Sequence, residues 1–440
     1  MSPHSPDATP TSASSSIQGR ADAPIFTRAF LLTCLASLCG YASFYVLLGT
    51  IPLYVGHVGG SELQVGLVVG MFSAISLCVR MPLGRACDEK GKRAFMLGGA
   101  LVLVLAGFVY SQSLSVGALI ASRALHGLGW ALFGTAVYAL VAETIPEARR
   151  GEAMGYYGIS SNIAMAVGPA IGFALLRMEG FGHVFAFSSA LAVVALLFTA
   201  ALREKSVAQK ARGASATTDT TDPDQRLHAD PHAGPKHHQM LERSALLPSG
   251  VMGVVTIGYS AIVSFLPLYA KANGVENPGF FFTVYAISLV LSRTFTGRLS
   301  DRYGRAAVII PGIGLVALAL MLAAPLARSV LGVGIIGALF GLGFATVQSS
   351  MMAMIADRAA PGHRGAAMGT YTAALDLGIG LGALLCGLLS ETLGFAPMFI
   401  IAGCTSLGAM ALFFVLDVLR KPASTHPERP DGGVANHART

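Results

Sequence analysis

Twelve long apolar runs constrain what this chain can fold into more than any other feature of its sequence. The hydrocarbon core of a bilayer, about 30 Å thick, is crossed by a helix of roughly 20 apolar residues. In the first half of the chain such runs lie near 29–55, 64–83, 94–112, 116–142, 153–176 and 182–202. In the second half they lie near 246–270, 278–296, 306–326, 329–356, 366–390 and 394–418. The sequence therefore predicts an all-α membrane protein whose chain crosses the bilayer once per run.

The composition supports lipid as the solvent of these runs. Of the 440 residues, 53% are hydrophobic and only 12% are charged, whereas a soluble domain carries about 25% charged residues. The 52 glycines are expected at helix contacts, where small residues let backbones approach closely. The six cysteines show neither CxxC nor metal-ligand spacing, so we expect no disulfide framework and no metal site among them.

Polar segments divide the chain. Residues 1–26 are rich in Ser, Pro, Ala and Thr and lack the pattern of a cleaved signal, so we expect a disordered N-terminal tail. The polar stretch 203–243 separates a six-helix unit over 27–202 from a second over 244–418, and 419–440 forms a C-terminal tail. The four histidines of this stretch could bind a metal or belong to a disordered linker, and the polarity of the stretch favours the linker. These histidines are His228, His232, His237 and His238.

The basic residues predict the orientation. In a twelve-helix topology, all but four of the 30 Lys and Arg residues fall on the side of the two termini, and this group includes Arg80 at the end of the second run. Basic loops face the cytoplasm, so we expect both termini in the cytoplasm and the helices in a bacterial inner (plasma) membrane. The net charge of +7 is then loop charge, and no nucleic-acid partner is expected. The four exceptions are Arg177, Lys271, Arg328 and Arg123, the last inside a helix.

An internal repeat relates the two halves. After the second run the chain reads Arg80-x-x-x-Gly84-Arg85-x-x-Asp88-x-x-Gly91-Lys92. After the eighth run it reads Arg293-x-x-x-Gly297-Arg298-x-x-Asp301-x-x-Gly304-Arg305. Further matches pair Glu143 with Asp357, Arg150-Gly151 with Arg364-Gly365, Pro52 with Pro267 and Tyr54 with Tyr269. Two six-helix halves related by an axis along the membrane normal are an architecture of secondary transporters.

These loops resemble the loop motif of the major facilitator superfamily: Gly, three residues, Asp, a basic residue, any residue, Gly and a basic residue. The second copy matches it in full, with Gly297, Asp301, Arg302, Gly304 and Arg305. The first copy matches with Gly84, Asp88, Gly91 and Lys92, although Glu89 stands where a basic residue is usual. The resemblance extends over 29–418 and implies the twelve-helix fold of that family, with two pseudo-symmetric six-helix bundles.

Two further patterns resemble motifs of the same family. Arg123-x-x-x-Gly127 in the fourth run is similar to its second motif. Gly168-Pro169-x-x-Gly172 in the fifth run is similar to the motif enriched in antiporters, with Phe173 in place of a usual second glycine. The resemblance therefore implies the drug or metabolite:proton antiporter branch. A bend or a close helix contact at Gly168-Pro169 that favours one direction of opening is the functional interpretation, and an ordinary proline kink is the alternative.

The loop motif implies a gate. By this resemblance, Asp88 and Arg85 would engage Glu143 and the start of the eleventh helix. Asp301 and Arg298 would engage Asp357 and the start of the fifth helix. Such clusters would stabilise the state closed to the cytoplasm and break in each transport cycle. The alternative is that these loops serve only topology and assembly.

Ionisable groups deep in a bilayer are candidates for function. Arg123 and His126 are three residues apart and share a helix face, and Asp376 occupies the position that Asn162 holds in the first half. We expect Asp376 to take up and release the coupling proton. Arg123 would favour the ionised form of Asp376 or hold an anionic group of the substrate, and His126 would be a second titratable group. A structural ion pair for Asp376 and a packing role for His126 are the alternatives.

The function expected from these features is proton-coupled efflux of a small amphipathic drug-like molecule or metabolite by alternating access. Uptake of a small nutrient by proton symport, or export of a sugar or metal chelator, are the alternatives. The sequence has no GxxxxGK[ST], HExxH or GxSxG pattern, so we expect neither an ATPase nor another enzyme and no cofactor. A channel and a non-transporting sensor were also considered. The expected partners are the small-molecule substrate, protons and lipid, and the expected state is a monomer.

Overall fold

The computed structural model describes residues 25–144, 150–202, 243–359 and 364–419. Nearly all of these residues are helical, and no strand occurs among them. Some side chains inside helices, among them those of Arg85 and Asp88, are not described. Most of the two predicted tails and of the central linker lies outside the described residues.

The first half contains seven helices among its described residues. They are α2 (Arg28–Leu48), α3 (Thr50–His57), α4 (Glu62–Lys90), α5 (Lys92–Ser111), α6 (Val116–Thr144), α7 (Arg150–Glu179) and α8 (Phe181–Ala200). Side chains define the start of two of them. The Thr27 hydroxyl accepts the Phe30 N–H at 3.2 Å before α2. Ser61 and Gln64 form a reciprocal capping box before α4.

The second half repeats this order with more interruptions. Its helices are α10 (Arg243–Ser260), the π-helical turn η3 (Ala261–Phe265), α11 (Leu266–Ala272), α12 (Phe280–Tyr303), α13 (Arg305–Met321), α14 (Ala323–Leu326), α15 (Val330–Arg358), α16 (Arg364–Leu393), α17 (Phe395–Phe413) and η4 (Phe414–Leu419). The breaks at equivalent positions have one cause. Pro52 cannot donate to the carbonyl of Leu48, where α2 ends, and Pro267 cannot donate to that of Val263, inside η3.

The predicted number of membrane-crossing segments is confirmed by the helices. Among the described residues, ten candidate spans are long and apolar enough to cross a bilayer. Two further segments stand at the remaining predicted positions: α12, which is bent by 46°, and the shorter apolar helix Arg305–Met321, which is α13. The fold is that of an all-helical membrane protein with twelve transmembrane segments, as the sequence predicts.

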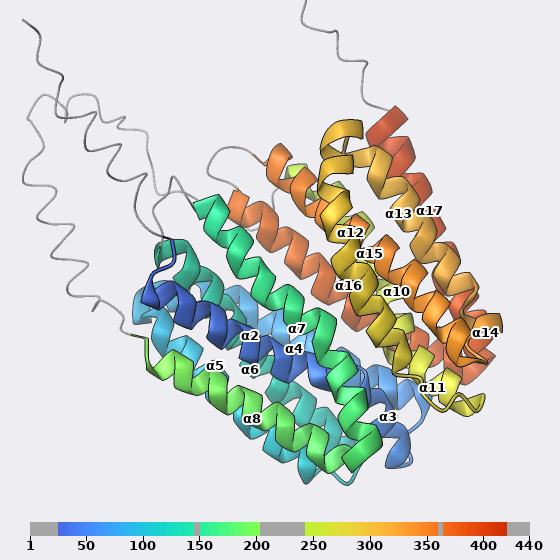
Figure 1. The fold of residues 1–440 in the computed structure, drawn as a ribbon, viewed down its shortest axis with the longest axis horizontal. Coiled ribbons are helices and arrows are strands. Elements are labelled where there is room, and N and C mark those ends of the chain that lie inside the picture. Colours follow the sequence, from blue (N-terminus) through green and yellow to red (C-terminus); the bar gives the residue numbers. More distant parts are fainter. Residues whose placement is uncertain (1–24, 145–149, 203–242, 360–363, 420–440) are drawn as a thin grey trace, which may run out of the picture.

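The helices form two bundles (Figure 1). In the first, α2 packs against α7 and α8, α5 against α6 and α8, and α4 against α6. In the second, α10 packs against α16 and α17, and α15 against α12 and α13. The bundles meet where α4 packs along α16 and where α7 packs on α12, with a smaller contact between α3 and α11.

The two ends of the bundles differ. Gly91 (φ +91°) joins α4 to α5, and Gly304 (φ +89°) joins α12 to α13. Only glycine adopts this backbone conformation without strain, and the end that carries these two turns is called the motif end below. At the opposite end the bundles touch: the Leu63 N–H donates to Glu391 Oε2 at 2.9 Å.

Candidate functional site

An ion pair joins the two bundles. Arg80 Nη1 of α4 lies 3.1 Å from Asp376 Oδ2 of α16, and the side chains are 26% and 18% exposed. The candidate membrane span of this helix, Glu62–Arg80, ends at Arg80. Because α4 continues to Lys90, Arg80 lies about 15 Å short of the helix end. The sequence counts Arg80 only among the basic residues on the side of the termini, and the structure pairs it with Asp376.

The geometry of this pair leaves donors and acceptors unused. Arg80 Nε and Asp376 Oδ2 are buried and make no hydrogen bond, so the two groups attract as charges without the fork geometry of a bidentate pair. Burial of charged groups is costly when hydrogen bonds do not complete their shells. The pair is therefore held less firmly than its burial alone would suggest, and an exchange of partners is correspondingly easier.

Glycines set the spacing between α4 and α16. A Cβ on Gly387 would lie 2.7 Å from the Glu62 carbonyl oxygen, and a Cβ on Gly380 would lie 2.8 Å from Ser73 Cβ. The two backbones can approach this closely only because no side chain stands between them. Asp376 follows one turn beyond Gly380 toward the motif end, so the ion pair lies next to the close-packed part of this contact.

A second charged site lies inside the first bundle. Arg123 of α6 is 1% exposed, and its guanidinium stands 5.4 Å from the ring centre of Phe72. His126 is equally buried, and its Nδ1 lies 3.2 Å from the Tyr110 hydroxyl. Arg123 Nε and Nη1 and His126 Nε2 make no hydrogen bond. The predicted proximity of Arg123 and His126 is therefore seen, but no ion pair links Arg123 to Asp376, whose partner is Arg80.

Aromatic rings surround Arg123 and His126. Phe44 of α2 stacks on Phe72 of α4 with ring centres 4.8 Å apart. Trp130, the one tryptophan of the chain, lies 4.4 Å from Phe44. Phe72 also meets the His126 ring at 5.5 Å. Three helices of the first bundle thus build one aromatic wall beside a buried cation. The sequence-based interpretation did not identify this wall, because residues on three helices have no common spacing along the chain.

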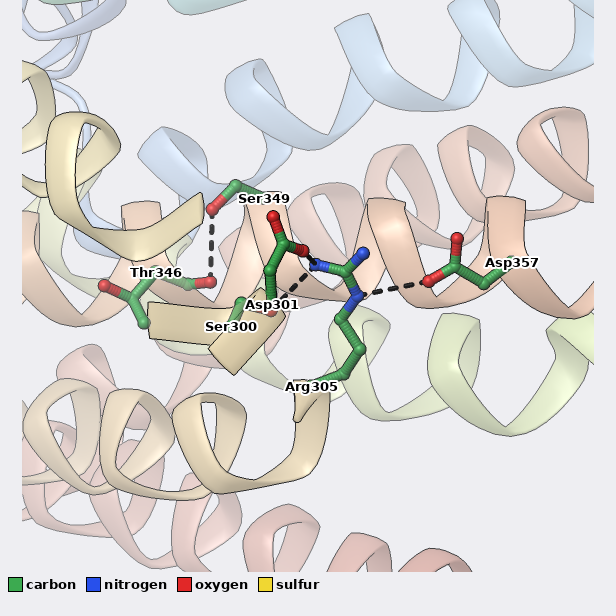
Figure 2. A network of polar contacts seen from close by, with 6 residues as sticks. All are labelled: Ser300, Asp301, Arg305, Thr346, Ser349 and Asp357. Atoms are coloured by element: carbon green, nitrogen blue, oxygen red, sulfur yellow. Dashed lines mark hydrogen bonds and ion pairs between the residues drawn. The ribbon is translucent and has the colours of Figure 1, made fainter. Parts of the chain in front are cut away.

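At the motif end of the second bundle, Arg305 connects three helices (Figure 2). Its Nη1 donates to Asp301 Oδ1 at 2.7 Å and to the Ser300 hydroxyl at 3.0 Å, and its Nε donates to Asp357 Oδ2 at 3.1 Å. The resemblance predicts a contact of Asp357 with Arg298. The structure assigns it to Arg305, because the turn at Gly304 starts α13 between the ends of α12 and α15. Arg298 is exposed.

This cluster joins α12, α13 and α15 within one bundle. Asp301 and Asp357 are 67% and 59% exposed, so each ion pair contributes little alone. Arg302 lies over the Tyr303 ring at 5.3 Å. The predicted latch between Asp301 and the start of α7 stays a prediction, because the side chains of the first residues of α7 are not described.

The first copy of the loop motif is described only in part. Gly84, Arg85 and Asp88 lie on α4 and Glu143 on α6, but their side chains are outside the described part of the structure. The predicted latch of Asp88 and Arg85 with Glu143 therefore stays a prediction. Lys92 is buried at the start of α5.

The antiporter-type motif lies where α7 packs on α2. A Cβ on Gly168 would lie 2.6 Å from Tyr45 Cβ, and a Cβ on Gly172 would overlap the Val46 carbonyl oxygen. Pro169 is buried, and α7 continues through it. This motif therefore produces a close helix contact within the first bundle. Asn162, half-buried on the same helix, lies nearer the motif end.

Phe173, the departure from that motif, faces the other bundle. Its ring stacks on Phe282 of α12 with centres 5.2 Å apart. A Cβ on Gly49 would lie 2.7 Å from both rings, and a Cβ on Gly279 would overlap Phe173. The large side chain thus fills the junction of α2, α7 and α12 at the opposite end. The sequence marks Phe173 only as an exception to a pattern, since its contacts come from residues far along the chain.

Comparison with known proteins agrees with this architecture. The sequence profile described as Major Facilitator Superfamily matches residues 33–279 and 249–436. The Staphylopine export protein of Staphylococcus aureus is 24% identical over 409 residues, which cover 91% of this chain and 98% of that protein. An uncharacterized MFS-type transporter of Salmonella typhimurium is 26% identical over 399 residues, covering 87% and 95%.

Solved structures share the fold. The nucleoside transporter NupG superposes with a TM-score of 0.67 at 15% identity, over 88% of this chain and 99% of that one. A POT family transporter in complex with 5-aminolevulinic acid superposes with a TM-score of 0.70 at 12% identity, over 88% and 96%. At these identities the likeness concerns the fold alone.

Proposed function

The chain belongs to the Major Facilitator Superfamily, and we propose that within this family it is a proton-coupled exporter of a small amphipathic molecule or metabolite. A multi-pass membrane transporter is the general function of such a chain. The proposal adds the direction of transport, the proton as the coupling ion, and the residues that link proton movement to substrate movement. It also places the protein in a bacterial inner membrane, as a monomer with both termini in the cytoplasm.

The ion pair between Arg80 and Asp376 carries the proposal. It spans the contact between α4 and α16, and this contact must change when the bundles rock between their two states. When Asp376 binds a proton its charge is lost, and the attraction to Arg80 is lost with it. Protonation therefore favours separation of the bundles at this point, and loss of the proton favours their return. This linkage makes transport depend on the proton gradient.

The gradient is large enough for this task. One charge that crosses a membrane potential of 100 mV provides about 2.3 kcal/mol, which sustains a concentration ratio of roughly fifty. Export with one proton taken up per cycle is thus feasible without a nucleotide.

Export is favoured over uptake by two observations. A relative that covers nearly the whole chain is named for the export of staphylopine, and the chain contains Gly168-Pro169-x-x-Gly172, which resembles the antiporter motif. The first observation also supports a metabolite as the cargo rather than a drug alone. Proton-coupled uptake of a small nutrient is the second candidate, because a symporter would use the same ion pair.

The test begins with a strain that lacks the protein. Export predicts that deletion raises sensitivity to the substrate or its level inside the cell, whereas uptake predicts a growth defect on it. A growth screen against a panel of drugs and metabolites identifies the substrate for vesicle experiments.

The coupling residue is then tested in everted vesicles. We expect Asp376→Asn to abolish substrate-driven proton movement, because an amide cannot take up the proton. Asp417→Asn is the matched control: Asp417 also faces an arginine, Arg358, but both residues belong to the second bundle. Proton movement that is undiminished in Asp376→Asn would remove Asp376 from the mechanism.

A further inference from the structure

Arg123 is a buried charge without a counter-ion in this structure. Among the described residues, no acid forms an ion pair with it, and its Nε and Nη1 make no hydrogen bond. Two acids of the second bundle already face other arginines, because Asp376 faces Arg80 and Asp417 faces Arg358. A third, Glu391, accepts the Leu63 N–H. A guanidinium does not lose its proton in proteins, so Arg123 cannot relieve its burial by becoming neutral.

Close helix packing holds Arg123 in place. A Cβ on Gly127 would lie 2.6 Å from the Phe72 carbonyl oxygen, so α6 and α4 are in close backbone contact one turn from Arg123. The Phe72 ring is thereby kept against the guanidinium. A cation over an aromatic face is attracted to it, but the ring offers no acceptor for the free N–H groups. The ring therefore supplies part of the electrostatic attraction that an anion would supply, but none of the hydrogen bonds.

We propose that Arg123 and the wall formed by Phe44, Phe72 and Trp130 are a binding subsite for an organic anion, and that the transported molecule is a carboxylate with an apolar body. This inference rests on the proposed function, because it names the chemical class of the cargo. The guanidinium binds the carboxylate with charge-assisted hydrogen bonds. The rings of the wall contact the apolar body, and His126 Nε2, which has no partner here, supplies a second polar group.

The position of the site fits a transport path. Arg123 lies about two turns inside the start of α6, near the end where the bundles touch, whereas Arg80 and Asp376 lie closer to the motif end. Phe72 directly precedes Ser73, which contacts Gly380 of α16. Arg123 is 1% exposed and Phe72 8% exposed, so the anion enters as the Phe72 ring turns away. Movement between α4 and α16 thus acts directly on the residue that covers Arg123.

Trp130 makes the site observable. It is the one tryptophan of the chain and stands beside Phe44, so its fluorescence reports on the wall without a label. The full-length protein in lipid nanodiscs is titrated with 3-phenylpropionate, hexanoate and glutarate, and with the uncharged amide of each. We expect the fluorescence of Trp130 to change saturably with at least one carboxylate. The half-saturating concentration of this carboxylate should be about tenfold or more below that of its amide, because one charge-assisted hydrogen bond contributes about that factor.

Two variants separate binding from folding. Arg123→Gln is expected to bind the carboxylate no more tightly than its amide, and Arg123→Lys to retain part of the preference because it keeps the charge. If Arg123 has only a structural role, the Arg123→Gln variant binds the carboxylate and the amide more weakly by the same factor. That result would overturn the proposal, as would equal binding of acid and amide by the unaltered protein, or no saturable change with any carboxylate.

The binding experiment contains no proton gradient. A negative binding result therefore does not contradict proton-coupled transport. Undiminished proton movement in Asp376→Asn likewise does not contradict the anion subsite. Asp417→Asn, which is remote from the wall in the second bundle, is expected to bind the carboxylates as the unaltered protein does.

Discussion

At the scale of single residues, the pair of Arg80 and Asp376 differs from the other ion pairs of the described chain in what it connects. Arg358 with Asp417, and Arg305 with Asp301 and Asp357, lie within the second bundle. Arg80 and Asp376 belong to different bundles, so their separation changes whenever the bundles move. A protonation event at Asp376 can therefore act on the whole assembly, whereas the other pairs stabilise one bundle in both states.

The charge of this pair can be tested by reversal. We expect Arg80→Asp and Asp376→Arg to lower the thermal unfolding midpoint, because each places two like charges in contact at a site that is mostly buried. The double variant restores opposite charges, and we expect it to recover about 1–3 kcal/mol relative to the sum of the single changes. Thermal unfolding of the four proteins in detergent measures this coupling. Strictly additive effects would show that the two side chains do not interact.

At the scale of elements, α7 uses two faces for two tasks. Gly168 and Gly172 bring it onto α2 inside the first bundle, while Phe173 stacks on Phe282 of the second. The glycine face requires a fixed backbone distance, because its neighbours are the backbone and Cβ atoms of Tyr45 and Val46. The aromatic contact joins two side chains, which can separate and meet again. The helix is thus firmly held on one side and separable on the other.

The glycine face predicts opposite effects for two substitutions in this one helix. Gly172→Ala places a Cβ onto the Val46 carbonyl oxygen, so we expect destabilisation of about 1–3 kcal/mol from overpacking and loss of transport. Gly158→Ala meets no atom within 4 Å, so we expect a gain of up to about 1 kcal/mol from helix propensity. Thermal unfolding and vesicle transport measure both. Equal midpoints would contradict the importance of the α2–α7 contact.

At the scale of the whole molecule, the structure is one state of a cycle. The bundles touch at the end where Leu63 meets Glu391 and Phe173 meets Phe282. With the orientation that the basic loops predict, the end at which the bundles touch faces the outside, and we propose that this state opens to the cytoplasm. An exporter loads its cargo in this state, and the cargo leaves only after the contacts at the closed end have broken.

A reversible cross-link tests whether this end must open. Leu63 of α4 and Glu391 of α16 adjoin at this end, so cysteines at these two positions, in a background without the native cysteines, are expected to be joined by a short reducible bifunctional thiol reagent. We expect the cross-link to abolish transport and its reduction to restore transport. Cysteines at Gly312 and Val347, which also pack closely but within the second bundle, are the control. Unaltered transport by the cross-linked protein would show that this end stays closed throughout the cycle.

The sequence predicted the elements of the fold well and the partners of the site poorly. The apolar runs, the family resemblance and the burial of Arg123 and His126 were all confirmed. The sequence linked Asp376 to Arg123, whereas the structure pairs Asp376 with Arg80, and the partner of Asp357 is Arg305 rather than Arg298. The latch of the first loop motif stays a prediction.

The sequence by itself determined the twelve membrane segments, their division into related halves, the breaks before Pro52 and Pro267, and the turns at Gly91 and Gly304. These are local properties, because lipid selects each apolar run and backbone chemistry acts within a few residues. Only the tertiary structure decided that Asp376 meets Arg80 while Arg123 has no acid. Such choices depend on the rotation of each helix about its axis and on distances between segments far apart in the chain.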